Sequence, residues 1–212
     1  MIGIVAHTSR AEQAHRLAET VGAVYTSIDN GRLGCNRNHH KTWTWLLQHN
    51  NSDWITVLED DAKPVPNFRQ QLAETQKTSP SPILSLYLGK KRPPHWQEAM
   101  KAATEKADKA DACFITAPLL LHAVAVTIHK DIISDLLPAI EHTTRPWDYA
   151  IGIWALQHHE PVSYTWPSLC DHKDGPTVAK HPDRKPRPPG RTAWRTGTRT
   201  IWRTEPTIDM RE

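Results

Sequence analysis

Apolar residues at the start of the chain follow first the pattern of a buried strand and then that of a helix. Residues 2–6 are almost continuously apolar, which is typical of a strand buried on both faces in a parallel sheet. Five apolar residues then recur at helical spacing before Gly22: Ala11, Ala14, Leu17, Ala18 and Val21. Ser9 and Glu12 stand in the positions of a capping box, and glycine commonly ends a helix. The pattern therefore predicts one strand followed by one helix.

The same alternation of strands and helices continues through residue 158. Further strands are predicted at residues 23–28, 54–58, 83–88, 113–116 and 123–128. Further helices are predicted at residues 36–49, after Pro66 through residue 72, at 130–141 and at 147–158. Strands that alternate with helices indicate a layered α/β domain with a mostly parallel central sheet.

Length and composition exclude several classes of protein. The 212 residues fit one domain with a tail, and 38% hydrophobic residues are too many for a disordered chain. The longest apolar stretch, residues 115–128, contains Pro118 and His122 and is shorter than the roughly 20 residues of a membrane span. Three widely spaced cysteines indicate neither a disulfide framework nor a zinc ribbon. The N-terminus lacks the features of a secretory signal, so we expect a cytoplasmic protein.

Positive charge is concentrated in the C-terminal part of the chain. Residues 173–212 hold ten Lys and Arg against five Asp and Glu, a net charge of +5, whereas the whole chain carries +3. We therefore divide the chain into a domain of residues 1–175 and a basic extension of residues 176–212. Proline, arginine and tryptophan are interspersed in this extension. Such a pattern suits either contacts with phosphates and bases or a stiff strap over the domain.

Glu59, Asp60 and Asp61 directly follow the predicted strand at residues 54–58, at the end where parallel sheets bind their ligands. Adjacent acids repel one another unless a cation or N–H donors meet them, which favours a hard divalent cation such as Mg²⁺ or Mn²⁺. The alternative is that these acids cap a solvated turn. Neither a GxGxxG fingerprint nor a P-loop follows the first strand, so the common nucleotide-binding folds are disfavoured.

Two motifs stand at a fixed spacing in the first third of the chain. The first comprises Gly34, Cys35, Asn38, His39 and Trp43, and the second is the block at residues 57–62. Together they resemble the Gly-Cys-x-x-Ser-His-x-x-x-Trp segment and the Leu-Glu-Asp-Asp block of the lipopolysaccharide-type glycosyltransferases of family 25. Residues 85–89, 122–126, 147–148 and 167–172 resemble a compact subgroup carried by tailed phages. The family's Asn-Leu-Asp-Arg segment is residues 6–10 here, and its Ser is Asn38.

The resemblance implies a GT-A-like, Rossmann-like layered fold and inverting transfer of a sugar from a nucleotide-sugar donor, with a UDP-sugar as the leading candidate. It implies Asp61 and Glu59 as ligands of Mn²⁺ or Mg²⁺, with Asp60 on the donor. His172 is the second candidate metal ligand. The alternative for His172 is a loop histidine paired with Asp171.

An inverting transfer needs a base for the acceptor hydroxyl, and the resemblance places Asp148 in that position. A helix N-cap is the alternative explanation for this aspartate. The candidate donor contacts, in addition to Asp60, are His7, Thr8, Arg10 and His39. His39 could equally be a buried, hydrogen-bonding core residue.

The acceptor is inferred from the extension, in which Arg191, Trp194 and Arg195 are the candidate contacts. Polyanionic DNA would be attracted to this segment, with Trp194 and Trp202 available to stack on bases. Because the resembling phage enzymes accompany hydroxymethylated pyrimidines, the leading hypothesis is transfer to a base hydroxyl of phage DNA in the host cytoplasm. Alternative acceptors are lipopolysaccharide, another surface glycan or a phage structural protein. The alternative of another class is a non-catalytic nucleic-acid-binding module.

Overall fold

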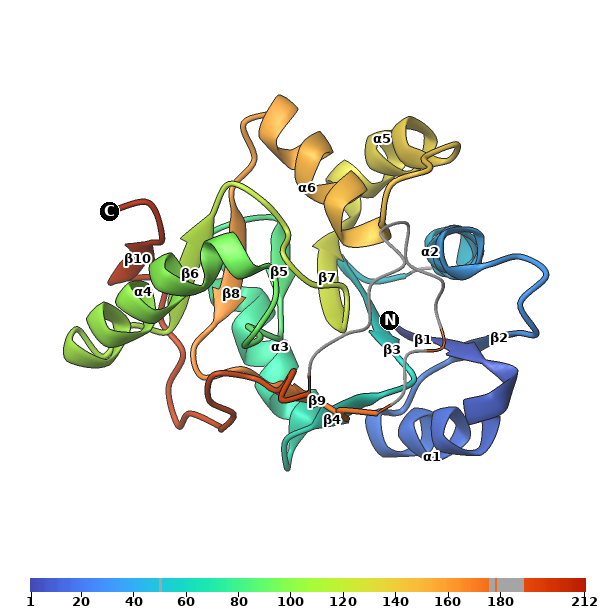
Figure 1. Cartoon of the computed structure of the whole chain (residues 1–212), viewed down its shortest axis with the longest axis horizontal. Coiled ribbons are helices and arrows are strands. Elements are labelled where there is room, and N and C mark those ends of the chain that lie inside the picture. The colour runs from blue at the N-terminus through green and yellow to red at the C-terminus, as the bar shows by residue number, and fades with distance from the viewer. Residues whose placement is uncertain (50, 176–177, 179–188) are drawn as a thin grey trace.

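An eight-stranded sheet with helices on both faces organises the computed structural model, which describes residues 1–49, 51–175, 178 and 189–212 (Figure 1). The strands of this sheet are β1 (Ile2–His7), β2 (Tyr25–Asp29), β3 (Trp54–Glu59), β5 (Ile83–Ser85), β6 (Phe114–Ala117), β7 (Ala125–His129), β8 (Val162–Thr165) and β10 (Thr207–Asp209). They lie in the order β10-β6-β8-β5-β7-β3-β1-β2. Four of the seven neighbouring pairs of described strands are parallel, so the predicted α/β fold with a mostly parallel central sheet is confirmed.

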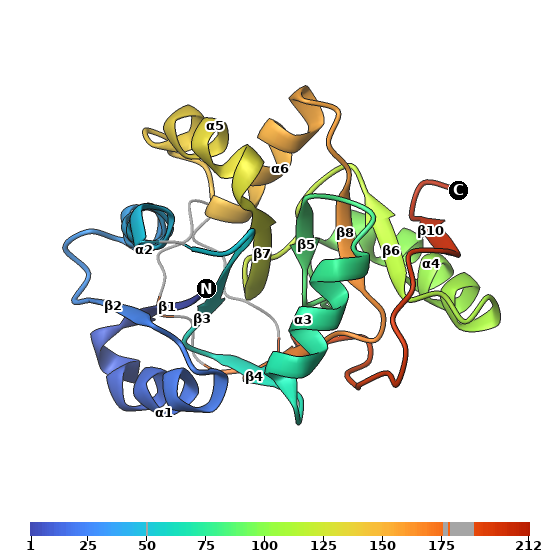
Figure 2. The same ribbon diagram turned by 180° about the vertical axis from the view of Figure 1, so that it is seen from behind.

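Helices cover the two faces of the sheet unequally. They are α1 (Ala11–Val21), α2 (Cys35–His49), α3 (Phe68–Thr78), α4 (Gln97–Lys109), α5 (Lys130–Ile140) and α6 (Trp147–Gln157), with 3-10 turns η1 (Thr8–Arg10) and η2 (Pro94–Trp96). Figure 2 shows α1 and α3 on the opposite side of the sheet from α2, α5 and α6. Of the helices in the described residues, none is long and apolar enough to cross a membrane.

Two hydrophobic cores therefore form, one on each face of the sheet. Ile55 and Val57 of β3 face the core beneath α2, α4, α5 and α6, whereas Leu58 faces the core beneath α1 and α3. Side chains of a strand alternate between its faces, and both faces are covered here. The central strands are consequently mostly apolar, and the buried hydroxyls of Thr56 in β3 and Thr127 in β7 bond each other at 2.9 Å.

The elements predicted from apolar spacing are present, with shifted ends, and Gly22 ends α1 in the left-handed conformation at φ 67°. The capping box is wrong. Ser9 does not cap α1, because its hydroxyl lies 2.8 Å from Nδ1 of His7, and Arg10 occupies the N-cap position. The prediction omits α4, whose buried face consists of the short or weakly apolar side chains Met100, Ala103, Thr104 and Ala107.

A second, two-stranded sheet joins distant parts of the chain at one edge of the molecule. Its strands, β4 (Ala62–Pro64) and β9 (Cys170–His172), are antiparallel, and Ala62 is the partner of His172. The ladder extends by one bond, from the backbone N–H of Lys173 to the carbonyl of Asp61 at 2.8 Å. This register brings His172 next to the acidic block.

The described part of the extension, residues 189–212, packs against the domain as a strap. Its β10 pairs in parallel with β6, and Trp202 is buried with its Nε1 donating to Oε1 of Gln71 at 2.8 Å. The expectation that Trp202 is available to stack on a base is therefore wrong. Lys185 and Arg187, which the charge argument also used, lie outside the described residues. The boundary at residue 175 stays a prediction.

We expect Trp202→Ala to lower the free energy of unfolding by about 3–5 kcal/mol, because it removes a buried ring and leaves Gln71 without that donor. Urea unfolding followed by tryptophan fluorescence measures the change. Ile201→Ala is the matched control, since Ile201 is 67% exposed and its loss should change stability by less than about 0.5 kcal/mol. Equal effects of the two substitutions would show that the strap adds little stability.

Candidate functional site

The carboxyl ends of three parallel strands meet at one edge of the sheet. After β1 the chain enters η1, after β2 it enters the loop that leads into α2, and after β3 it continues into Asp60 and Asp61. Ligands of open α/β sheets bind outside such ends. The predicted donor loop and the acidic block therefore lie side by side in the fold.

Asp60 and Asp61 are both buried, and one guanidinium serves both. Nη1 of Arg10 lies 2.8 Å from Oδ1 of Asp60 and 2.6 Å from Oδ2 of Asp61. The backbone N–H of His7 donates to Oδ2 of Asp60 at 2.9 Å. Arg10, Asp60, Asp61 and His172 are called the Asp61 cluster below.

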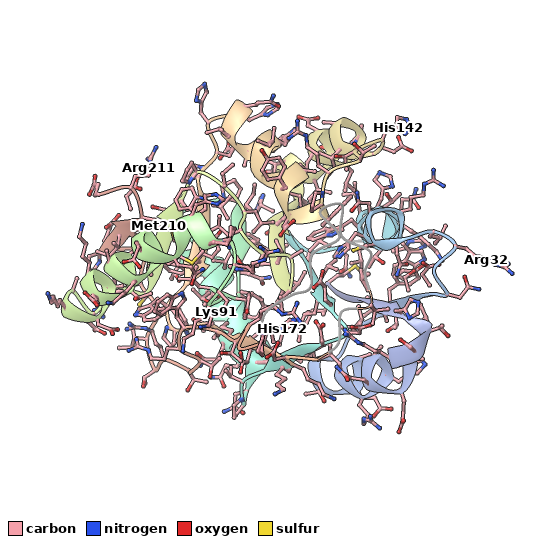
Figure 3. All side chains as sticks on the ribbon, viewed as in Figure 1. Arg32, Lys91, His142, His172, Met210 and Arg211 are labelled. Carbon is pink, nitrogen blue, oxygen red and sulfur yellow. The ribbon has the colours of Figure 1, made fainter. Side chains whose placement is uncertain are left out.

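His172 completes this cluster through the β4–β9 register, and Figure 3 shows its position beside these strands. Its Nε2 lies 3.3 Å from Oδ2 of Asp61. Its Nδ1 lies 2.9 Å from the carbonyl oxygen of Arg191, which can only accept, so Nδ1 carries the proton. The ring is thereby oriented with Nε2 toward Asp61. The alternative pairing of the His172 ring with Asp171 is absent, because Asp171 instead accepts from the backbone N–H groups of His172 and Ala193.

The charges of the cluster are strongly interdependent. Burial raises the pKa of Asp61, but the hydrogen bonds and charges of His172 and Arg10 outweigh burial and hold that pKa below its ordinary value. Burial lowers the pKa of His172, but Asp61 outweighs it and the pKa is raised. The pKa of Asp60 is raised, chiefly by burial. An ionised Asp61 therefore stabilises positive charge on its neighbours.

The Asp61 cluster fits the divalent cation that the resemblance implies. Oδ1 of Asp61 is buried and has no hydrogen-bond partner among the described residues, which leaves an acceptor unused. Nε2 of His172 offers a nitrogen ligand beside it, held in place by a hydrogen bond from the opposite ring atom, as is common for metal-binding histidines. Asp61 and His172 are thus the pair that would hold Mn²⁺ or Mg²⁺.

Glu59 has a different partner from Asp61 and belongs to a second group. Its Oε1 lies 3.2 Å from Nε2 of His39, whose ring stacks on Trp147 with centroids 5.4 Å apart. The ligand atoms of Cys35, His39 and Glu59 all lie within 4.8 Å of one another. Among the described residues, no hydrogen bond or ion pair joins Glu59 to Asp61 or His172, although the charge of Glu59 helps to raise the pKa of His172. Cys35, His39, Glu59 and Asp148 are called the Glu59 cluster below.

His39 is buried, with 1% of its surface exposed, so the structure favours the buried, hydrogen-bonding alternative over a direct donor contact. Burial lowers its pKa, but hydrogen bonds and charge from Cys35 and Glu59 raise it to about 10. An imidazolium here is held between two acidic groups. Its role in this arrangement is to fix the Glu59 carboxylate.

Asp148 lies at the start of α6, but it is not the N-cap. Pro146 holds that position, and the carboxylate of Asp148 instead accepts from the backbone N–H of Tyr149 at 2.8 Å. Burial raises the pKa of Asp148 to about 6, with a further rise from the charge of Glu59. A carboxyl group that titrates near neutral pH is suited to proton transfer.

Of the remaining candidates for donor contact, His7 is the last residue of β1 and Thr8 is the first residue of η1. Thr8 is exposed and His7 is half-buried, with the His7 ring held by Ser9. Sequence reasoning missed Gln13, one turn after Arg10, whose Nε2 donates to the carbonyl of Asp60 at 2.6 Å. The sequence did offer a signal for Gln13, because this residue stands three positions after Arg10 and so shares one helical face with it.

Asn38, the departure from the family's Ser, has all of its side-chain atoms satisfied. Its Nδ2 donates to the carbonyls of Ala6 and Ser27 at 3.0 and 3.2 Å, and its Oδ1 accepts from the Ser27 hydroxyl at 2.6 Å. The amide thereby connects α2 to the ends of β1 and β2. The substitution is structural in this chain and leaves the neighbouring His39 in place.

The three predicted acceptor contacts do not gather in one place. Arg191 lies by the Asp61 cluster, where its carbonyl also accepts from the hydroxyl of Tyr87 at 3.3 Å and its side chain bonds Asp174. Trp194 is half-buried against the core, and Arg195 pairs with Asp108 at 2.8 Å. Among the three, only Arg191 contacts a residue of the Asp61 cluster in the described structure.

A family model described as "Glycosyltransferase family 25 (LPS biosynthesis protein)" matches residues 7–115. No curated protein matches the chain. A crystal structure of a protein from STIV is similar with a TM-score of 0.48 and 10% identity, over 95% of this chain and 96% of that one. A glycosyltransferase involved in glycosylation of the major capsid of PBCV-1 has a TM-score of 0.35 and 13% identity, over 70% and 71%. Both structural likenesses are too distant to support an argument about function.

The raised pKa of Asp148 predicts a pH-dependent cost to stability. Between about pH 4 and pH 6 the folded state keeps a proton that the unfolded state has released, so the free energy of unfolding falls as the pH rises through this window. Asp148→Asn removes this cost and should raise the free energy of unfolding by about 1–2 kcal/mol at pH 8, with little change at pH 4. Urea unfolding at both pH values measures the difference. Asp135→Asn, at an exposed position of α5, is the control, and a loss of stability at both pH values would contradict the prediction.

Proposed function

The chain belongs to glycosyltransferase family 25, and from this premise we propose that it transfers a sugar from a nucleotide-sugar donor to an acceptor hydroxyl with the help of a divalent cation. One observation carries the proposal. The buried Asp61 cluster lies at the carboxyl ends of β1 and β3 and holds an unpartnered carboxylate oxygen beside an oriented imidazole. With a divalent cation bound to it, this arrangement would suit a donor diphosphate better than an uncharged ligand. A UDP-sugar is the donor that the resemblance favours.

A bound Mn²⁺ or Mg²⁺ would neutralise the negative charge that develops on the leaving diphosphate, without any proton transfer. Asp61 and His172 would hold it. Asp60 has its carboxylate bonded to Arg10 and to the N–H of His7. These bonds fix the loop after β1 at the position proposed for the donor, with Thr8 exposed on it.

Asp148 is the proposed base. It takes the proton from the acceptor hydroxyl as the acceptor oxygen bonds to the anomeric carbon, and the bond from that carbon to the donor phosphate breaks with its electron pair leaving on the diphosphate. One such displacement inverts the anomeric centre. Support comes from the pKa of about 6, which leaves the carboxylate ionised at neutral pH yet able to accept a proton.

The structure changes the argument about the acceptor. Four arginines of the extension already pair with acidic side chains: Arg191 with Asp174, Arg195 with Asp108, and Arg199 and Arg203 with Asp111. Pairing reduces the positive charge available to a polyanion, and Trp202 is buried. Since the matching family model is described by lipopolysaccharide biosynthesis, a saccharide hydroxyl becomes the leading acceptor. Hydroxymethylated DNA remains the second candidate because of the net charge of +5 of residues 173–212.

Asp61→Asn and Asp148→Asn should separate the two proposed roles. Asp61→Asn removes the ligand charge at nearly constant shape, so donor binding in the presence of Mn²⁺ and donor turnover should both be lost. Asp148→Asn should keep donor affinity and lower the transfer rate by about 10²–10⁴-fold, the usual contribution of a general base. Calorimetric titration with UDP-sugars and the rate of UDP release measure the two effects.

Unfolding curves of both variants are the control, because each must remain folded at the assay temperature. Turnover by Asp61→Asn at the rate of the unsubstituted chain would contradict the metal site. Loss of donor affinity in Asp148→Asn would contradict the assignment of this residue as the base.

For the acceptor, we expect labelled sugar to be transferred to lipopolysaccharide and not to DNA, since the four arginines named above, all in the described part of the extension, are paired within the protein. The measurement offers a labelled donor in parallel to lipopolysaccharide, hydroxymethylated DNA and unmodified DNA. Label in hydroxymethylated DNA alone would contradict this and support the base hydroxyl. An inert protein that binds DNA with a steep salt dependence would support the non-catalytic module.

Arg195→Ala serves as the test of the extension in this assay, with Arg211→Ala as its matched control at another exposed arginine paired with an acid. A truncation near residue 175 would not serve, because it removes the carbonyl that orients His172 and the strand β10.

A further inference from the structure

Three side chains with different donor atoms meet at the start of α2. Cys35 is the first residue of this helix, His39 lies one turn further along the same face, and Glu59 ends β3. Their ligand atoms, a sulfur, an imidazole nitrogen and a carboxylate oxygen, lie within 4.8 Å of one another. Donors of these three kinds are those that zinc binds in proteins.

The surrounding structure holds each of the three in position. The carboxylate of the buried Asp29 accepts from the backbone N–H groups of Gly31, Leu33 and Gly34 at 3.0–3.1 Å, which fixes the loop directly before Cys35. The His39 ring is stacked on Trp147 at an interplanar angle of 18°. Sites placed on regular elements and braced in this way need little reorganisation to bind.

His39 also has unused binding capacity. Its ring is 1% exposed, yet Nδ1 has no hydrogen-bond partner among the described residues. Nε2 is the ring nitrogen beside Glu59, at 3.2 Å from Oε1, so it is the nitrogen that could share an ion with that carboxylate. Cys35 is exposed and opens the group to solvent, which provides a route of entry for an ion.

We propose that Cys35, His39 and Glu59 form a binding site for a thiophilic divalent cation of the Zn²⁺ class, separate from the Asp61–His172 pair. Three protein ligands would leave a fourth position for water, as in other open zinc sites. Ligands of tetrahedral zinc lie about 3.5 Å apart, so separations of up to 4.8 Å need to close by about 1.3 Å at most. Rotation of the exposed Cys35 side chain supplies that movement.

The donor atoms distinguish the two sites. A thiolate selects soft or borderline ions such as Zn²⁺ and Co²⁺, whereas a carboxylate that completes its shell with phosphates suits Mg²⁺ and Mn²⁺. Zinc at the Glu59 cluster would connect the N-terminus of α2 to the end of β3, beside Asp148. The proposal is independent of glycosyl transfer, because it requires only these three side chains.

Titration of the reduced full-length protein with Co²⁺ tests the proposal. We expect one Co²⁺ per chain with the near-ultraviolet charge-transfer absorption of a cobalt–thiolate bond and with visible bands of four-coordinate intensity, both of which Zn²⁺ removes. Cys35→Ser should abolish the charge-transfer band and weaken binding at least tenfold. Glu59→Gln should keep the band and weaken binding, because the thiolate remains.

Two variants serve as controls for this titration. Asp61→Asn should leave the cobalt–thiolate band unchanged, and so should His49→Ala, at an exposed histidine of the same helix. Absence of the band from the unsubstituted chain, its persistence in Cys35→Ser, or its loss in Asp61→Asn would overturn the proposal. The proposal would also be overturned if Asp61→Asn lost Co²⁺ binding while the other variants kept it. That result would instead support the metal site of the proposed function.

Discussion

Two adjacent carboxylates buried at the end of β3 are the constraint on which the rest of this structure depends. An ionised carboxylate away from water is very unfavourable unless cations and N–H donors surround it. Asp60 and Asp61 receive such partners from three separated segments: Arg10 and the N–H of His7 after β1, and His172 from β9. The parallel β1–β3 pairing and the β4–β9 ladder are therefore what allow the acids to be buried. The same partners leave one oxygen of Asp61 without a hydrogen bond among the described residues, and this is the oxygen through which we propose that the cluster binds a cation.

Much of this arrangement could be predicted from the sequence because it depends on local patterns. Mostly apolar runs predicted β1 and β3, since both faces of these strands are covered and few of their positions reach water. The acids after β3 stood out as a cluster of like charge at a ligand-binding end. The orientation of His172 could not be predicted, because it depends on the register of two short strands and on the backbone carbonyl of Arg191, and a carbonyl leaves no trace in the choice of amino acid.

Two other features misled sequence reasoning for identifiable reasons. Three consecutive acids were interpreted as one group, but β3 ends at Glu59, so the alternation of a strand does not govern the two acids that follow it. Glu59 contacts His39, whereas Asp61 contacts His172. Arginine and tryptophan together suit nucleic acid and also suit a strap that forms ion pairs and fills a core. In the described residues the second use is the one observed for Arg199 and Trp202, since Arg199 bonds Asp111 and Trp202 bonds Gln71.

The contact that residue 191 makes with His172 has a consequence for the order of events during synthesis of the chain. A nascent chain that ends before residue 190 already contains every acidic residue of both clusters, but it lacks the carbonyl that accepts from Nδ1 of His172. It also lacks β10, which covers the edge of β6. Contacts between segments so far apart in the sequence form late in folding, because loop closure must precede them. In a chain made from its N-terminus, the hydrogen bond that orients His172 and the pairing of β10 with β6 therefore form only after residues 191 and 207–209 have been made.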